Sequence, residues 1–266
     1  MDLKGKVAIV TGAGRGIGRS IAEKMADHGA LLVVTDLDVE SAAAVAQELI
    51  GQGREAEAIA VDVTKQSSVD RMVKGAVARF GQVDILVNNA GIIAAPGWEN
   101  RSTSNDKDWA MIYDVNVRGV ARVTESAAVH MKKRRYGKIV NIASLAGRQG
   151  SPGNPPYHVS KAGVISLTQA SAIGLAPFNI NVNAICPGNL WTPMWERIAT
   201  RQTAFVESRA GLTPRQAFDA ENSERIPLGR EQTPEDVAYL AVFLASEYAK
   251  NITGQAINVN GGMRMD

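Results

Sequence analysis

A tyrosine and a lysine four positions apart, Tyr157 and Lys161, are the residues of this chain whose types and spacing best suit chemistry. Four residues is about one helical turn, so in a helix both side chains share one face. A lysine ammonium beside a phenol favours the phenolate. Because a free tyrosine has a pKa of about 10, work near neutrality needs a shift of roughly three units, about 4 kcal/mol. With the glycine-rich segment Thr11–Gly18 upstream, the pair predicts a nicotinamide-dependent oxidoreductase.

Composition restricts the classes of protein to which the chain can belong. The 266 residues are 45% hydrophobic and 21% charged, which suits one α/β domain with a large core. A net charge of +2 attracts neither nucleic acid nor an anionic membrane, and no apolar run approaches the roughly 20 residues of a bilayer span. One cysteine, Cys186, and no room for a signal peptide predict a cytoplasmic protein. The histidines lack ligand spacing, so we expect no metal site.

Short β-branched runs alternate with longer helical patterns, which is typical of a parallel sheet with helical crossovers. The expected strands are Val7–Val10, Leu31–Thr35, Glu57–Val61, Ile85–Val87, Lys138–Ile142, Asn181–Ile185 and Ala256–Val259. The expected helices are roughly Gly16–His28, Val39–Gln52, Gln66–Phe80, Lys107–Arg135, Tyr157–Leu175 and Pro234–Ser246. Residues 188–230 break the alternation, and we interpret them as a helical excursion over the site within a single domain, 1–266.

The first expected strand leads into a glycine turn that opens a helix. Glycine lets the backbone approach a pyrophosphate closely, and a helix N-terminus supplies amide donors and a positive dipole. The spacing is T-G-x-x-x-G-x-G, carried by Gly12, Gly16 and Gly18, with Ile17 in the place of the last glycine of the stricter G-x-G-x-x-G pattern. Because the turn lies between a strand and a helix, we expect it to bind a dinucleotide.

Two residues near this turn point to different cofactors. Asp36 ends the second strand, where an acid binds the adenosine ribose, and its carboxylate would repel the 2′-phosphate of NADP by about 4 kcal/mol at about 4 Å. Arg15 would attract that phosphate, but we favour NAD because Asp36 lies directly at the ribose. Asp62 either holds the adenine amino group or caps the next helix. Asn88–Gly91 offers hydrogen-bonding side chains or is a simple turn.

The reacting half of the site is expected around Tyr157. Ser144 ends the fifth strand, and its hydroxyl and the phenol suit one carbonyl oxygen together. In the direction of oxidation Tyr157 removes the alcohol proton while NAD accepts hydride, and Lys161 also suits the nicotinamide ribose. Asn116 is unusual in the middle of a helical pattern and suits a water that links Lys161 to solvent. Each residue also has a structural interpretation, such as a local helix bend at Asn116, but their combination in this order favours catalysis.

Together these motifs resemble the short-chain dehydrogenase/reductase family from about Leu3 to Gly262. The resemblance implies a doubly wound Rossmann-type parallel sheet of seven strands with helices on both faces, and a homotetramer paired through the long helices and the last strand. It implies a catalytic tetrad of Asn116, Ser144, Tyr157 and Lys161. The expected cofactor-binding residues are Gly12, Arg15, Gly16, Ile17, Gly18, Asp36, Asp62, Val63, Asn89, Ala90, Gly91, Tyr157, Lys161, Pro187, Gly188 and Thr192.

The substrate is less constrained by the sequence. Residues 187–195 are similar to segments of acetoin and sugar-alcohol dehydrogenases, which implies a small secondary alcohol, polyol, sugar or vicinal diol. A 3-oxoacyl-thioester reductase is one alternative, although Asp36 argues against its usual NADPH. A nucleotide-binding sensor or scaffold without turnover is another. Aromatic and sulfur-containing side chains either roof the site or pack the excursion onto the body: Trp98, Trp191, Met194, Trp195 and Phe205.

Several charged residues have two interpretations. Arg148, Arg209 and Arg215 either meet an anionic substrate or are solvated at the surface, and the second is the default for arginine. The basic run Lys132–Arg135 ends a long helical pattern, where cations favour the helix dipole, so we interpret it as a solvated helix terminus. Cys186 ends a buried strand and is expected to be a small core residue rather than a nucleophile.

Overall fold

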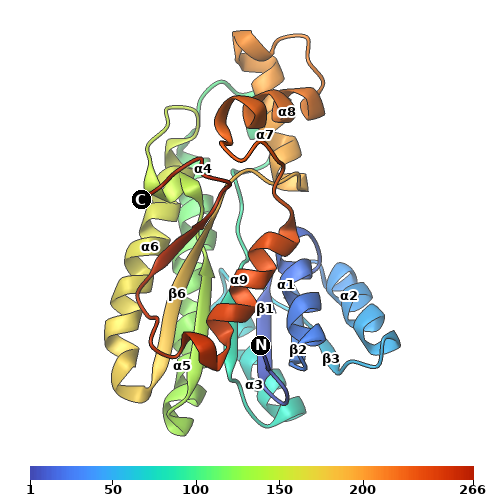
Figure 1. The fold of residues 1–266 in the computed structure, drawn as a ribbon, viewed down its shortest axis with the longest axis vertical. Helices are drawn as coiled ribbons and strands as arrows, with labels where there is room; N and C mark the ends of the chain where they lie inside the picture. Colours follow the sequence, from blue (N-terminus) through green and yellow to red (C-terminus); the bar gives the residue numbers. More distant parts are fainter.

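The computed structural model describes all 266 residues and is built on one parallel sheet of seven strands (Figure 1). The strands are β1 (Val7–Thr11), β2 (Leu31–Asp36), β3 (Ala56–Ala60), β4 (Ile85–Asn88), β5 (Gly137–Ile142), β6 (Ile180–Pro187) and β7 (Ala256–Val259). Their order in the sheet is β3-β2-β1-β4-β5-β6-β7. All seven strands expected from the sequence are present, so the predicted fold class is confirmed.

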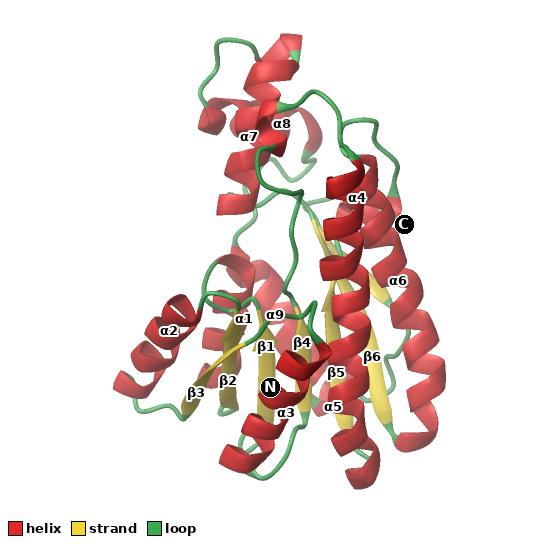
Figure 2. Cartoon of the chain, turned by 180° about the vertical axis from the view of Figure 1, so that it is seen from behind, coloured by secondary structure: helices red, strands yellow, loops and turns green.

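Helices cover both faces of the sheet. All of β1 is buried, with Ala8 and Val10 in one core cluster and Val7 and Ile9 in the other, which explains why its sequence is apolar without alternation. One face is covered by α1 (Gly16–Asp27), α2 (Val39–Gly51) and α9 (Pro234–Ala245), and the other by α3 (Gln66–Phe80), α5 (Val120–Arg134) and α6 (Pro155–Leu175) (Figures 1 and 2). None of these helices combines the length and apolar character of a bilayer span.

The strand order reverses beside β1, because β2 and β3 lie on one side of it and β4 on the other. In a doubly wound sheet the loops that follow two such strands leave in opposite directions, and a crevice opens between them at the carboxyl edge. Val10 of β1 pairs with Val87 of β4, so the segments that begin at Gly12 and Asn89 lie side by side at this edge. The fold therefore brings together two motifs that are far apart in the sequence.

The helix expected over Lys107–Arg135 is not continuous. It consists of α4 (Asp106–Tyr113), a π-helical turn over Asp114–Gly119, and α5. Asn116 lies in this turn, and its carboxamide is hydrogen-bonded to both backbone groups of Ile92 at 2.9 Å. The prediction of one helix is wrong because its periodicity does not reveal this contact with a distant loop. π-Helical turns occur frequently at functional positions.

The excursion contains two helices, α7 (Pro193–Phe205) and α8 (Pro214–Arg225), which Figure 1 shows in orange above the sheet. The rings of Trp191 and Trp195 lie 5.2 and 5.1 Å from that of Phe218, which is fully buried on α8. These two tryptophans therefore pack the two helices together. Trp98 is also buried, 4.5 Å beneath the guanidinium of Arg201 on α7.

Candidate active site

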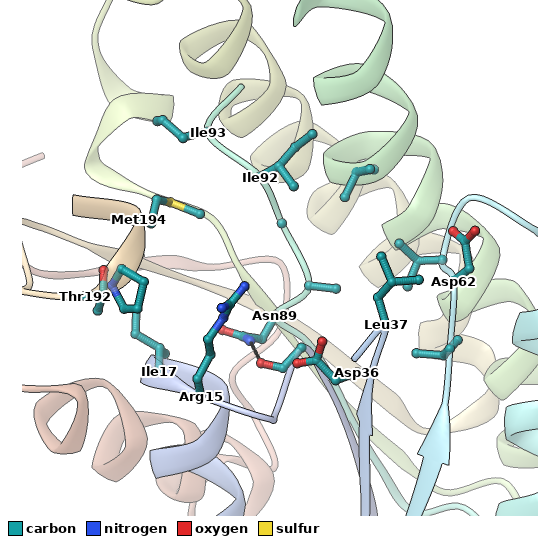
Figure 3. A pocket seen from close by; sticks show the side chains of 18 of the residues that line it. Arg15, Ile17, Asp36, Leu37, Asp62, Asn89, Ile92, Ile93, Thr192 and Met194 are labelled. Carbon is teal, nitrogen blue, oxygen red and sulfur yellow. Dashed lines mark hydrogen bonds between the residues drawn. The ribbon is translucent and has the colours of Figure 1, made fainter. Parts of the chain in front are cut away.

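A pocket of about 440 Å³ opens at the carboxyl edge of the sheet, within the range of about 300–1,000 Å³ that small-molecule sites occupy. Eleven of the expected cofactor-binding residues line it: Gly12, Arg15, Gly16, Ile17, Asp36, Asp62, Val63, Asn89, Ala90, Gly91 and Thr192. Figure 3 shows Asp36, Leu37 and Asp62 on one side and Ile93 and Met194 on the other. The pocket therefore has an acidic end and an apolar end.

The glycine turn is held against the loop after β4. Asn89 Nδ2 donates to the carbonyl oxygens of Thr11 and Gly12 at 2.9 and 2.8 Å. Gly12 has φ +64°, and a Cβ there would lie 2.9 Å from Ala90 Cα. A Cβ on Gly18 would lie 2.2 Å from the Gly12 carbonyl oxygen, although Gly18 itself does not line the pocket. Gly12 and Gly18 are thus required by close packing of strand, turn and helix.

The start of α1 suits a bound anion. The residue before the helix, Arg15, makes no capping hydrogen bond with its side chain. The first amide groups of a helix have no partner within it, and Gly16 and Ile17, which carry such groups, line the pocket. Gly16 has φ +57°, and the nearest atom to a Cβ there would be Thr192 Cγ2 at 3.8 Å, so space remains beside the turn. These features fit the pyrophosphate of a dinucleotide.

The two acids at the other end of the pocket are fixed in different ways. Asp36 accepts hydrogen bonds from the backbone amides of Gly14 at 3.0 Å and Asp38 at 3.1 Å. Asp62 accepts from the backbone and hydroxyl of Thr64, which holds the pKa of its carboxyl below the usual value, and lies 3.0 Å from Lys65 Nζ. Asp62 therefore stabilises the turn before α3 while still lining the pocket.

The tandem asparagines at the end of β4 serve different parts of the fold. Asn88 is buried, and its Nδ2 donates to Thr124 Oγ1 at 2.9 Å and to Asn141 Oδ1 at 2.8 Å. These bonds link β4 to α5 and β5. Asn89 lines the pocket and holds the glycine turn. The segment is therefore more than a simple turn.

The four residues of the expected tetrad come from the segment that follows β5, from α6 and from the π-helical turn. Asn116 is buried and donates to Ser160 Oγ at 3.1 Å, one residue from Lys161. Lys161 is buried and donates to the Ile142 carbonyl oxygen at 2.8 Å, with Nζ 5.7 Å from the ring centre of Tyr157. Ser144 follows β5, and its hydroxyl lies close enough to Tyr157 to act on the pKa of the phenol. The structure thus brings these side chains into one region.

This region meets the pocket at its apolar end. None of the tetrad residues lines the pocket, but the Tyr157 hydroxyl lies 4.0 Å from Sδ of Met194, which does. Gly91 also lines the pocket, and a Cβ there would lie 3.3 Å from Asn116 Oδ1 and 3.6 Å from Lys161 Nζ. The absence of a side chain at Gly91 therefore leaves both groups close to the pocket.

The pKa of Tyr157 differs from the sequence prediction. Burial raises it to about 12, and the neighbouring Ser144 hydroxyl opposes this rise. Burial also lowers the pKa of Lys161 to about 8. The expected decrease for the phenol is wrong because the lysine ammonium is bonded to Ile142 and because burial disfavours the charged form of both groups. Tyr157 thus holds its proton at neutral pH and is suited to donate it.

Some expected site residues have other roles. Pro187 ends β6 and is buried in the sheet, and a Cβ on Gly188 would lie 2.9 Å from both Asn260 Cβ and Gln232 Nε2. Neither lines the pocket. Of the side chains considered as a roof, only Met194 lines it, whereas Phe205 is exposed at the end of α7. Close packing against the C-terminal segment explains Gly188.

The arginines considered for an anionic substrate are occupied elsewhere. Arg209 is buried and pairs with Glu224 at 2.7 Å, and Arg215 pairs with Glu231 at 2.6 Å. Arg148 donates to the Ala256 carbonyl oxygen. Both interpretations fail for Arg209, which is neither solvated nor free. At the end of α5, Arg134 pairs with the buried Asp84 at 2.6 Å, so that basic terminus is partly held by the fold.

Several lining residues were not found from the sequence: Leu37, Val61, Thr64, Ile92, Ile93, Val115, Pro193 and Arg197. Ile92 and Ile93 directly follow Gly91, so their place in the chain was a usable signal. Arg197 lies three residues after Met194 on α7 and faces the same pocket. Helical spacing from Met194 could have identified it. The expected core position of Cys186 is confirmed, since it is fully buried.

Known proteins resemble this chain over nearly its whole length. A family model described as enoyl-(acyl carrier protein) reductase matches residues 12–264. The chain is 36% identical to the 3-oxoacyl-(acyl-carrier-protein) reductase FabG of Thermotoga maritima, over 99% of both chains. It is 39% identical to the sorbitol dehydrogenase of Cereibacter sphaeroides, over 98% of both. The crystal structure of levodione reductase matches with a TM-score of 0.88 and 28% identity, over 97% of both chains.

Proposed function

The chain belongs to the short-chain dehydrogenase/reductase family and is an oxidoreductase that acts on CH–OH groups, and from this premise we propose that it interconverts a small secondary alcohol and its ketone with NAD(H). The substrate we propose is a polyol, sugar or vicinal diol. One observation carries the proposal: the Tyr157 hydroxyl borders the apolar end of a pocket whose other end presents the start of α1 and Asp36.

The chain's own residues divide the work of proton transfer. Tyr157, with its pKa raised to about 12, donates a proton to the carbonyl oxygen in reduction and removes it from the alcohol in oxidation. Ser144 orients the same oxygen through its hydroxyl. Lys161, with its pKa lowered to about 8, exchanges a proton near neutral pH more readily than an ordinary lysine. A bound nicotinamide supplies or accepts the hydride.

Asn116 holds this arrangement in place. Its carboxamide bonds Ile92 on the pocket loop and Ser160 on α6, and Ser160 Oγ in turn donates to the Tyr157 carbonyl oxygen at 2.8 Å. The π-helical turn thus connects the loop after β4 to the helix that carries Tyr157 and Lys161. We infer that this connection sets the distance between the phenol and the pocket.

The choice of NAD rests on charge. Asp36 presents a carboxylate to the pocket, held by two backbone amides, and repels a 2′-phosphate. Arg15 is the cation on the same part of the pocket lining. Arg15 is exposed and its side chain is flexible, so solvent screens the charge of Arg15 more than the charge of the half-buried Asp36. The balance favours NAD over NADP.

A 3-oxoacyl-thioester reductase is a second candidate. The apolar surfaces of Ile92, Ile93 and Met194 beside the phenol suit an acyl chain. FabG of Thermotoga maritima and the sorbitol dehydrogenase of Cereibacter sphaeroides are similar to this chain to nearly the same degree. Initial rates with acetoacetyl thioester and with sorbitol, each with NAD(H) and NADP(H), separate the two.

Replacing Tyr157 with phenylalanine tests the proposed proton donor. We expect turnover to fall at least about 100-fold, because general acid–base catalysis contributes about 10²–10⁴. Cofactor binding, measured by NADH fluorescence, should survive. The control is Tyr248→Phe, which removes an exposed phenol. Activity retained in Tyr157→Phe contradicts the assignment, and a wild-type protein that binds NADH but turns over no carbonyl or alcohol in a broad panel supports the sensor alternative.

We also propose that the chain forms a homotetramer. Large apolar side chains are exposed along α4, α5 and α6: Trp109, Tyr113, Val129, Val159 and Ile173. The last strand, β7, is an edge of the sheet and leaves backbone groups unpaired. Burial of these surfaces in an assembly removes them from water. Sedimentation equilibrium measures the mass of the assembly, and a monomer at micromolar concentration contradicts the proposal.

A further inference from the structure

We propose that Arg197 is a specificity-determining residue, which donates a hydrogen bond to a neutral hydroxyl of the substrate two or three carbons away from the reacting carbon. Glu99 is its positioning residue, which also neutralises its charge. The inference rests on the proposed function, because it assumes that the substrate reacts beside Tyr157. It assigns a role to an ion pair, Arg197–Glu99, that proton transfer does not use.

Arg197 lies at the substrate end of the pocket. It lines the pocket on α7 together with Met194, whose Sδ is 4.0 Å from the Tyr157 hydroxyl. Met194 and Arg197 are three residues apart on one helix, which is a rise of about 4.5 Å along its axis. A substrate whose reacting carbon lies beside Tyr157 therefore reaches the guanidinium with a group that is two or three carbons away, and not with a group on the reacting carbon itself.

The guanidinium is held in place but keeps free donors. Its Nη2 donates to Glu99 Oε2 at 2.8 Å and to the Ala95 carbonyl oxygen at 3.2 Å. Its Nε and Nη1 groups make no hydrogen bond within the protein, and the side chain is 35% exposed. The planar guanidinium keeps its N–H groups in a fixed geometry, so fixing one edge also fixes the direction of the others. Arg197 is thus oriented to donate to an oxygen in the pocket.

The charge of the pair favours a neutral partner. The hydrogen bond from Arg197 holds the pKa of Glu99 below its usual value, so both groups are ionised at neutral pH and their charges cancel. An anion near Arg197 would therefore gain little net attraction. The neighbouring arginines do not change this, because Arg101 pairs with buried Asp108, and Arg201 donates to backbone carbonyls over Trp98. Neither lines the pocket.

The surfaces between the two ends suit a carbon chain. Ile92, Ile93 and Met194 line the pocket (Figure 3). Ile93 belongs to the small apolar cluster around buried Trp98, and Ile92, Met194 and Tyr157 pack against that cluster. The three lining side chains offer no hydrogen-bonding group except the weak thioether. A substrate with one hydroxyl at Tyr157, a short carbon chain over these residues and a second hydroxyl at Arg197 matches the whole lining. A diol or polyol has this chemistry, whereas a simple alcohol leaves Arg197 without a partner.

Three matched compounds and three variants test the inference. 1,3-Butanediol has the second hydroxyl, 2-butanol lacks it, and 3-hydroxybutyrate replaces it with a carboxylate. We expect the wild-type ratio of kcat/KM for the diol to that for 2-butanol to fall about 10- to 100-fold in Arg197→Met, the range for a lost hydrogen bond to a charged group. Arg225→Met removes an exposed arginine from an ion pair on α8 and should leave the ratio as in wild type.

Glu99→Gln provides the second part of the test, because it leaves the charge of Arg197 uncompensated. We expect this variant to raise kcat/KM for 3-hydroxybutyrate relative to the diol by about 10-fold. If the pair had only a structural role, the substitutions would lower kcat/KM for all three substrates together. The inference would be overturned if Arg197→Met lowered kcat/KM equally for the diol and 2-butanol, so that their ratio stayed unchanged. It would also be overturned if Glu99→Gln did not raise kcat/KM for 3-hydroxybutyrate relative to the diol.

Binding measurements separate failure of this inference from failure of the proposed function. Titration calorimetry of the three compounds into NADH-saturated wild-type protein and Arg197→Met reports recognition without turnover, because the reduced cofactor cannot accept hydride from an alcohol. If no compound is oxidised, the proposed function fails; tighter binding of the diol than of 2-butanol, lost in Arg197→Met, still supports the role of Arg197. If both compounds bind equally to the wild type, the inference is overturned whether or not the enzyme oxidises them.

Discussion

Replacing Asp36 with asparagine removes one negative charge from the pocket while keeping the shape of the side chain. In the structure, Oδ2 of Asp36 accepts from the Gly14 amide at 3.0 Å and Oδ1 from the Asp38 amide at 3.1 Å. The amide oxygen of asparagine can keep one of these bonds, so the turn should hold its shape. We therefore expect the substitution to change the discrimination between NAD and NADP rather than the proton chemistry at Tyr157.

The magnitude follows from the charge and its surroundings. Two unit charges about 4 Å apart repel by about 4 kcal/mol at an effective dielectric near 20. Asp36 is half-buried and Arg15 lines the same pocket, so water and the opposite charge reduce the repulsion, and we take roughly half, about 2 kcal/mol. Because 1.4 kcal/mol is a factor of ten, kcat/KM with NADP should rise about 30-fold relative to that with NAD.

The assay is initial-rate kinetics with one alcohol and both cofactors, for the wild type, Asp36→Asn and Asp36→Asn/Arg15→Ala. If charge repulsion is the cause, the ratio of kcat/KM with NADP to that with NAD rises mainly because kcat/KM with NADP increases. Removal of Arg15 then reverses much of this increase. A ratio that stays constant in Asp36→Asn would refute the assignment. A ratio that changes only because NAD binding is lost would show that Asp36 binds the ribose without excluding the phosphate.

Two other substitutions test the energetics of the site. Burial lowers the pKa of Lys161 from 10.5 to about 8, so the folded state carries the cost of the buried ammonium below pH 8 and loses it as the pH rises toward 10.5. Lys161→Met should abolish activity. It should nevertheless raise the free energy of unfolding at pH 7 by about 2 kcal/mol, because the cost of the buried ammonium is removed and only about 1 kcal/mol is lost with the bond to Ile142. Denaturant melts should show that this gain vanishes by about pH 10. Gly18→Ala places a Cβ 2.2 Å from the Gly12 carbonyl oxygen, so it should weaken NADH binding and lower the melting temperature by several degrees. The control is Gly51→Ala, whose Cβ would have no atom within 4 Å and which should change neither quantity. Equal effects of the two alanines, or a Lys161→Met protein less stable than the wild type at pH 7, would contradict this account.

The sequence was sufficient to predict the sheet because its strands and helices have strong local patterns. β1 is buried on both faces and is apolar without interruption, and α9 begins at the expected Pro234 after Thr233, whose backbone and side chain form a capping box with Asp236. Local patterns do not contain contacts with distant segments. The break between α4 and α5 was therefore missed, since it depends on the bonds between Asn116 and Ile92.

The sequence by itself determined the candidates for the chemistry, because the glycine turn, Asp36, Tyr157 and Lys161 are identified by residue type and spacing. Only the tertiary structure decided what surrounds them. Desolvation depends on every segment packed around a group, so the raised pKa of Tyr157 and the lowered pKa of Lys161 could not follow from their spacing. The pairing of Arg197 with Glu99, 98 positions away in the chain, likewise exists only because α7 folds over the loop after β4.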